Sequence, residues 1–149
     1  MTRRGLLLAM LTVRLRADDA QEVWDLFTQL ASALSEGNPV QFLKAFDRSM
    51  AGYRILEADV TALLSQAEVQ SSIEVLSGEG NGAARMVELD WFLQIVEQQD
   101  AAGSTRRRER VRCRLSKQKK KWLITGLDPL ALFAPPKQRG SLAGRFRLC

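Results

Sequence analysis

The sequence predicts an α+β domain in which N-terminal helices pack on the concave face of a curved, mostly antiparallel sheet. Up to about residue 66, apolar residues recur at the three- and four-residue spacing of amphipathic helices. Beyond that point the spacing becomes two, the period of strands that bury one face. Four strand-like segments follow one another at hairpin distance, so consecutive strands are expected to pair antiparallel. Helices that precede such a sheet cover one of its faces.

Length and charge favour one domain whose two halves complement each other. The chain has 149 residues, of which 46% are hydrophobic, enough for a single globular core. Residues 18–103 hold 4 basic and 15 acidic side chains, net −11, while residues 104–149 hold 14 basic and 2 acidic ones, net +12. The formal charge of +5 therefore does not by itself indicate a nucleic-acid-binding protein.

Residues 1–17 have the pattern of an export signal. Arg3 and Arg4 precede the nine-residue apolar run 5–13, and Ala17 stands before an acidic pair. The paired arginines resemble the twin-arginine class of bacterial signals, although Leu15 is large for the position three before the cut. We expect an exported, periplasmic or extracellular protein with no membrane span in the mature chain, because nine residues cannot cross a bilayer. The alternative is a cytoplasmic protein whose N-terminal segment packs on the core.

Three helices are expected in the first half of the domain. The first begins at Asp18 or Asp19 and ends at Gly37; the second starts at Asn38-Pro39, with asparagine as the cap and proline in the first turn. A break at residues 49–52 precedes the third helix, which runs from Tyr53 to about Gln66. The apolar positions that define the helical faces are Val23, Phe27, Leu30, Leu34, Val40, Leu43, Phe46, Leu56, Val60, Leu63 and Leu64.

Four strands are expected after the helices. The first lies over residues 69–75 and is followed by a glycine-rich hairpin turn at 78–82. The second covers 87–95, with Trp91 on its apolar side, and the third covers 106–115. A turn at 117–120 leads to the fourth strand around Trp122, and residues 130–133 add a short turn on the core. The domain is thus assigned to residues 18–135, and residues 136–149 are expected to form a basic flexible tail.

The composition argues against a metal or cofactor site. The chain has no histidine and only two cysteines, Cys113 and Cys149, so a zinc site lacks ligands and a disulfide is not expected. Acidic residues are not clustered at the spacing of a calcium loop. The glycine-rich turn lacks the Lys-Ser/Thr pair of a phosphate-binding loop. We expect no cofactor.

The stretch from Asp18 to Pro135 resembles the nuclear transport factor 2-like superfamily, the cone-shaped, cystatin-like fold shared by ketosteroid isomerases and scytalone dehydratase. The resemblance implies a homodimer formed through the open sheet, to which Phe92 and Leu123 would contribute apolar surface. That superfamily includes enzymes, transport adaptors and binding modules, so the fold does not assign a function. The segments that carry the resemblance are the helix with Val23, Trp24 and Phe27, the segment 42–47, the strand 87–91 and the closing strand 121–124.

The resemblance also implies one catalytic hypothesis. Isomerases of this type place an acidic base near the end of the second helix, where Asp47 stands, and Tyr53 is the available phenol for an oxyanion. Burial in an apolar pocket would raise the pKa of Asp47. The alternative is that Asp47 caps the turn after the second helix and pairs with Arg48 or Arg54. Dehydratase chemistry of the kind that depends on histidine has less support than the isomerase hypothesis, because the chain has no histidine.

The tryptophans admit two interpretations. As rigid walls with an N–H donor, Trp24, Trp91 and Trp122 would line a pocket for a small apolar ligand, together with Phe46, Asp47 and Tyr53. The alternative, which we favour, is that each lies on the buried side of its element and packs in the core. Burying one such ring contributes roughly 2 to 3 kcal/mol without any ligand.

Five arginines alternate along the third strand, at Arg106, Arg108, Arg110, Arg112 and Arg114. With the lysines up to Lys121 they form a basic ribbon that could bind phosphates or another anionic surface. However, the segment lacks the stacking aromatics of single-strand binders, and Glu88 and Asp90 are expected on the same face. We therefore favour a cross-strand ladder of ion pairs and do not expect nucleic acid as a partner. The resulting hypothesis is a non-catalytic ligand-binding or protein-interaction module.

Overall fold

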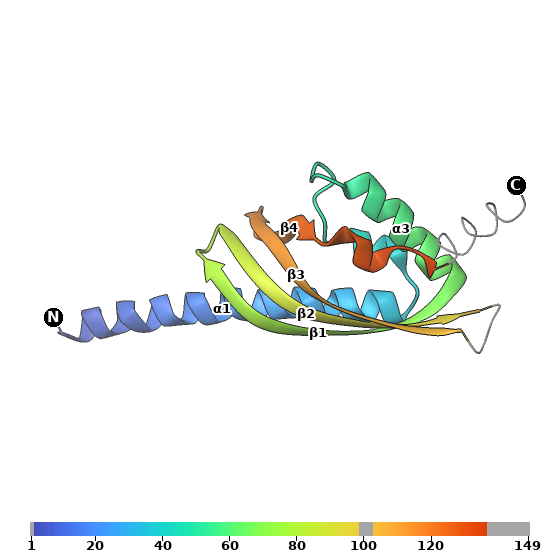
Figure 1. Ribbon diagram of the computed structural model, residues 1–149. Helices are drawn as coiled ribbons and strands as arrows, with labels where there is room; N and C mark the ends of the chain where they lie inside the picture. The colour runs from blue at the N-terminus through green and yellow to red at the C-terminus, as the bar shows by residue number, and fades with distance from the viewer. Residues whose placement is uncertain (1, 99–102, 137–149) are drawn as a thin grey trace, which may run out of the picture.

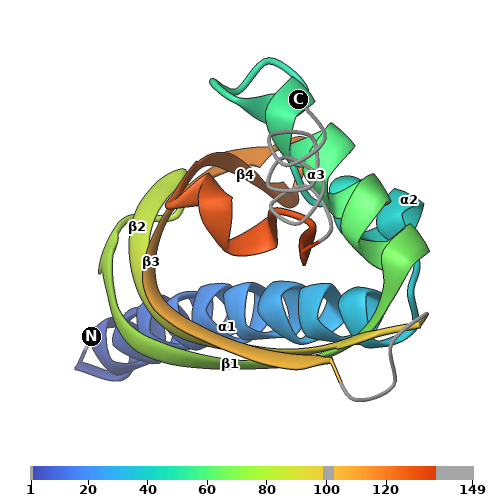
Figure 2. The same cartoon turned by 45° about the vertical axis from the view of Figure 1, so that its right-hand side comes forward.

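In the part of the chain that the structure describes, three α-helices and a short 3-10 helix pack in the hollow of a four-stranded antiparallel sheet (Figures 1 and 2). The computed structural model describes residues 2–98 and 103–136, with side chains described from Asp19 onward. The strands follow the order β1-β2-β3-β4, so the predicted antiparallel meander is confirmed. The elements are α1 (Thr2–Ser35), α2 (Pro39–Leu43), α3 (Tyr53–Gln66), β1 (Ala67–Gly80), β2 (Ala84–Glu97), β3 (Ser104–Gln118), β4 (Lys121–Asp128) and the 3-10 helix η1 (Leu130–Phe133).

Helix α1 is longer than the sequence predicts. It runs without a break across residues 17 and 18, and its N-terminal part extends beyond the sheet (Figure 1). Its end is the expected one: Gly37 has a left-handed φ of 71°, and the amide of Asn38 donates to the carbonyl of Ala33 at 2.9 Å. The side chain of Asn38 then caps α2 by accepting from the amide of Gln41 at 3.0 Å. The export signal remains a prediction, and the expected tail from residue 137 onward lies outside the described residues.

Strand β1 also exceeds its predicted length. It continues to Gly80, with a bulge between Val75 and Ser77. The turn to β2 is correspondingly short, and the Asn81 side chain accepts from the amides of Ala83 and Ala84. Gly80 has a φ of 139°, and a Cβ at this position would lie 2.3 Å from the Ala84 carbonyl oxygen. Only glycine fits there, which explains part of the glycine-rich sequence of this turn.

The core lies between the helices and the concave face of the sheet. Alternate residues of β2 point inward and are at most 1% exposed, as the period of two predicts. Helix α1 contributes its expected stripe, including Phe27 and Leu30, which are also buried. The segment after α2 pairs with β4, because the amide of Asp47 donates to the Ile124 carbonyl and that of Ile124 donates to the Ala45 carbonyl. The inward residues of β2 are Val87, Leu89, Trp91, Leu93 and Ile95.

Among the helices that the structure describes, none combines the length and the apolar character that crossing a bilayer requires.

Candidate functional site

Aromatic side chains fill the centre of the concave side. Trp91 is fully buried, and its ring meets Phe133 edge-on at 5.1 Å between centroids, while Phe42 lies 5.4 Å from Phe133. The indole N–H of Trp91 donates to the Ser71 hydroxyl at 2.8 Å. Phe46, also buried, packs 5.1 Å from Phe42. Trp91 thus contributes to the core with its polar group satisfied by a neighbouring strand, the arrangement expected of a structural tryptophan.

Trp122 joins the sheet to α1. Its indole N–H donates to Glu22 at 3.0 Å, and Lys117 lies 3.3 Å from both Glu22 and Asp19. The hydrogen bond to Asp19 is the main cause that raises the pKa of Lys117. A half-open hollow of about 260 Å³ lies beside Trp122, between α1, α2 and β4. The sequence did not indicate this polar cluster, because its members are about 100 residues apart.

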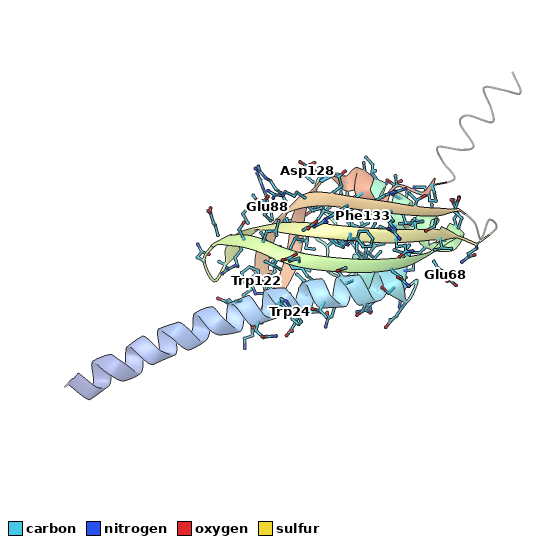
Figure 3. The ribbon with its side chains drawn as sticks, turned by 60° about the horizontal axis from the view of Figure 1, so that its bottom comes forward. Trp24, Glu68, Glu88, Trp122, Asp128 and Phe133 are labelled. Atoms are coloured by element: carbon cyan, nitrogen blue, oxygen red, sulfur yellow. The ribbon has the colours of Figure 1, made fainter. Side chains whose placement is uncertain are left out.

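Trp24 does not lie in the core. We expected it on the buried side of its helix, but its exposed fraction is 56%. It follows Val23, which is buried, and therefore lies about 100° further around the helix. Figure 3 shows it on α1 where the helix begins to leave the sheet. The prediction of burial was wrong for this tryptophan, which instead lines a shallow hollow at the surface.

Asp47 and Tyr53 have different surroundings. Asp47 accepts from the amide and hydroxyl of Ser49, at 2.9 and 2.7 Å, and from the side-chain amide of Gln118 at 3.3 Å. The bonds from Ser49 lower the pKa of Asp47, whereas the isomerase hypothesis requires a raised one. Asp47 therefore lacks the surroundings that the isomerase hypothesis requires. The capping interpretation describes the residue, with Ser49 and Gln118 as partners in place of Arg48 or Arg54.

Tyr53 is largely buried at the start of α3. Together with Phe46 and Arg48 it lines a hollow of about 370 Å³ that does not include Asp47. The structure thus does not bring the two candidate groups to one cavity wall. No cluster of metal-binding side chains occurs within residues 19–98 and 103–136.

The arginine ladder lies on the outer, convex face of the sheet. All five predicted arginines of β3 are exposed. Arg108 bonds to both carboxylate oxygens of Asp90, with 3.1 Å from Nε to each, and Arg110 lies 3.5 Å from Glu88. The hydrogen bond from Arg108 lowers the pKa of Asp90. The predicted cross-strand pairing with β2 is confirmed, although each pair is diagonal, since Asp90 stands directly opposite Arg110.

The outer face is divided by charge. On β1 to β3 the acidic side chains belong to β1 and β2 and the arginines belong to β3, while β4 adds Asp128 opposite Arg112. One row across the sheet reads Glu74, Asp90, Arg110. The pKa of Arg108 is raised mainly by its hydrogen bond to Asp90, and Glu74 adds to the shift. Figure 3 shows Glu68 and Glu88 toward opposite ends of this face. Alternation with Val69 and Ile73 places Glu68 and Glu74 on this face, whereas Glu79 reaches it because of the bulge after Val75. The acidic set is Glu68, Glu74, Glu79, Glu88 and Asp90.

Comparison with solved structures identifies the fold. A nuclear transport factor 2-like superfamily protein from Salmonella enterica serovar Typhimurium matches with a TM-score of 0.63 at 12% identity, over 75% of this chain and 89% of that one. A proposed scytalone dehydratase from Novosphingobium aromaticivorans matches with a TM-score of 0.70 at 6% identity, over 77% and 85%. A protein of unknown function from Mycobacterium tuberculosis matches with 0.65 at 14% identity, over 77% and 72%.

These matches confirm the predicted nuclear transport factor 2-like fold. At such identities they establish the fold and leave the activity open. No protein-family model matches the sequence, and no curated protein sequence does.

Proposed function

We propose that this chain is an exported, non-catalytic interaction module that pairs with a second copy of itself through the outer face of its sheet. The observation that carries the proposal is the division of that face into an acidic part on β1 and β2 and a basic part on β3. A two-fold interface brings the same patch of both copies together. A patch with two separated charges can then be complementary to itself, with the acidic part of each copy on the arginines of the other.

The centre of the face suits such a contact. Phe92 points outward between Ser72 and Arg108 and is only half-buried. Leu123 faces outward on β4 and Met86, 38% exposed, on β2. Interfaces bury apolar and aromatic groups at their centre and keep charged groups toward the rim. Arginine is also enriched at interfaces, because its planar fork binds carboxylates with two hydrogen bonds.

The non-catalytic part of the proposal depends on the opposite face. Trp91, Phe42 and Phe133 occupy the centre of the concave side, where isomerases of this fold would hold a substrate. Asp47 has a lowered pKa and is held by Ser49 and Gln118. These observations support a closed scaffold, and the isomerase alternative has correspondingly less support.

Charge reversal tests the self-association. In sedimentation experiments we expect the wild type to dimerise more tightly at low salt than at high salt. The variant Arg108→Glu/Arg110→Glu and the variant Glu88→Lys/Asp90→Lys should each be monomeric, while their equimolar mixture should form a heterodimer. The control is Arg54→Glu, which changes an exposed side chain of α3 and should leave the dimer intact. A monomeric wild type at all salt concentrations, or a mixture that stays monomeric, would contradict the proposal.

Export is tested separately. When the full chain is produced in a bacterium, we expect the periplasmic protein to begin at Asp18, which intact mass measurement detects. Replacement of Arg3 and Arg4 by lysine should retain the protein in the cytoplasm if the twin-arginine route is used. A cytoplasmic wild-type protein that keeps residues 1–17 would contradict the export proposal.

A further inference from the structure

A hollow of about 280 Å³ lies between α1 and the end of the β1–β2 hairpin. It is on the concave side of the sheet, away from the outer face proposed for self-association, because Val87 and Arg85 point inward. Its volume is near the lower end of the range for small-molecule sites. Its walls are mainly apolar; they are formed by Ala20, Val23, Trp24, Val75, Leu76, Ser77, Gly78, Arg85 and Val87.

Three of the large apolar side chains at this hollow are exposed. The exposed fractions are 56% for Trp24, 38% for Val75 and 42% for Leu76. Leu76 stands at the bulge of β1, where the extra residue leaves the regular alternation. Single exposed apolar side chains are common, but a group of them around one concavity marks a surface on which an apolar group can be buried.

Arg85 provides the charged group of the hollow. Its Nε atom is buried and has no hydrogen-bond partner, and no carboxylate pairs with its guanidinium in the part of the chain that the structure describes. Arg85 takes part in the inward-facing row with Leu115 and Gly80. A buried polar atom without a partner in a folded protein calls for an explanation, and the rest of the Arg85 side chain is half-buried.

Gly78 leaves room beside this guanidinium. A Cβ at Gly78 would lie 3.5 Å from Nη2 of Arg85 and 3.8 Å from Val87. A side chain longer than alanine would therefore occupy the space beside the cation. The glycine keeps one side of Arg85 open toward the hollow.

We infer that this hollow binds a small amphipathic carboxylate, with the carboxylate on Arg85 and the apolar body against Trp24, Val75 and Leu76. The guanidinium fork matches the two oxygens of a carboxylate, and a ligand on its Nη side would supply the ion pair that Arg85 lacks among the described residues. An indole ring and branched aliphatic side chains suit an alkyl or aryl body. This ligand site goes beyond the proposed self-association and does not depend on it.

Octanoate is the probe, and 1-octanol is its neutral match. Trp24 is the exposed tryptophan of the three, so we expect octanoate to shift its fluorescence to shorter wavelength, and Trp24→Phe to abolish the shift. Arg85→Gln should weaken octanoate binding by about tenfold or more, since a charge-assisted hydrogen bond is lost. Arg106→Gln, which removes an exposed charge from the outer face, is the matched control and should bind as the wild type does.

The inference is overturned if calorimetry detects no octanoate binding to the full-length wild type, if octanol binds equally well, or if Arg85→Gln retains full affinity. Leu76→Asp serves as a second variant, because an exposed position tolerates the change and its carboxylate would repel the ligand. It should lose octanoate binding and keep its thermal unfolding temperature. Unchanged binding in a folded Leu76→Asp protein would likewise overturn the inference.

Discussion

The two faces of the same sheet have opposite physical characters, and consecutive residues of β2 show the difference. Leu89 and Trp91 are fully buried on the inner face, whereas Asp90 between them points outward and bonds to Arg108. The inner face stabilises the fold through burial of apolar side chains. Because these side chains are closely packed, few other residues would fit in their places. The outer face contributes mostly exposed ion pairs, which stabilise little. This leaves the outer face free to carry recognition, and it makes the register of the strands the feature on which both roles depend.

The largest expected effect is that of Trp91→Ala. Removal of this ring leaves a cavity against Phe42 and Phe133, so the free energy of unfolding should fall by about 3 to 5 kcal/mol. Chemical denaturation measures the loss. Phe92→Ala, one residue along the same strand but on the outer face, is the control and should cost much less. Equal losses in the two variants would show that the faces do not differ as the structure indicates.

Cys113→Ser tests how completely the inner face excludes water. Cys113 is fully buried on β3, and burial raises the pKa of its thiol well above the ordinary value. A serine hydroxyl at this position lacks a partner, so the variant should lose about 1 to 3 kcal/mol relative to the wild type. Cys113→Ala introduces no polar group and should be the more stable of the two substitutions in urea unfolding. A serine variant as stable as the alanine variant would indicate a water or a polar partner inside the core.

Much of this comparison could be predicted from the sequence, because strand alternation assigns each side chain to a face. The inward set of β2 and the outward arginines of β3 were both expected, and both are found. The buried stripe of α1 followed from its three- and four-residue spacing. The spacing of apolar residues along a helix or strand thus indicates which of its faces is buried in the core.

The surroundings of single residues could not be predicted in this way. Trp24 borders the buried stripe of α1, and its exposure depends on where the sheet ends beneath the helix. Asp47 has its pKa lowered partly by Gln118, which is 71 residues away in the chain. Arg85 was not singled out, because an inward-facing cation is recognised only once its neighbours are known. The surroundings of these three residues are determined by contacts between segments that are distant in the sequence. The spacing of apolar residues within one element does not reveal such contacts.

The stability of the fold should respond to acid through Asp90 on the outer face and Asp47 after α2, and the pH range follows from the direction of their pKa shifts. Hydrogen bonds lower the pKa of Asp90 and of Asp47 from the ordinary 3.8 in the folded protein. Their stabilising contribution is therefore present above pH 3.8 and is lost as the pH falls below it. Asp90→Asn and Asp47→Asn should each make the loss of stability in acid shallower, as thermal unfolding between about pH 5 and about pH 2 measures.

Asp59 is the control for this experiment, because its pKa is shifted in the opposite direction to those of Asp90 and Asp47. Burial raises its pKa, so its folded form gains stability as the pH falls toward 3.8. Asp59→Asn removes that gain and should make the acid loss steeper. The same slope in all three variants would show that these carboxylates do not govern the acid response.

The smallest expected effect concerns the ion pair between Arg108 and Asp90. A double-mutant cycle with Arg108→Gln and Asp90→Asn isolates their coupling from the other interactions of each residue. Because the arginine side chain is 71% exposed, the coupling should be weak at low salt and should vanish near 1 M salt, where the screening length is about 3 Å. Self-association through this face would make the coupling larger at high protein concentration, since the second copy would exclude water from the pair. Measuring the cycle at two protein concentrations therefore separates a solvated ladder from an interface, and a coupling that is independent of both salt and concentration would contradict both interpretations.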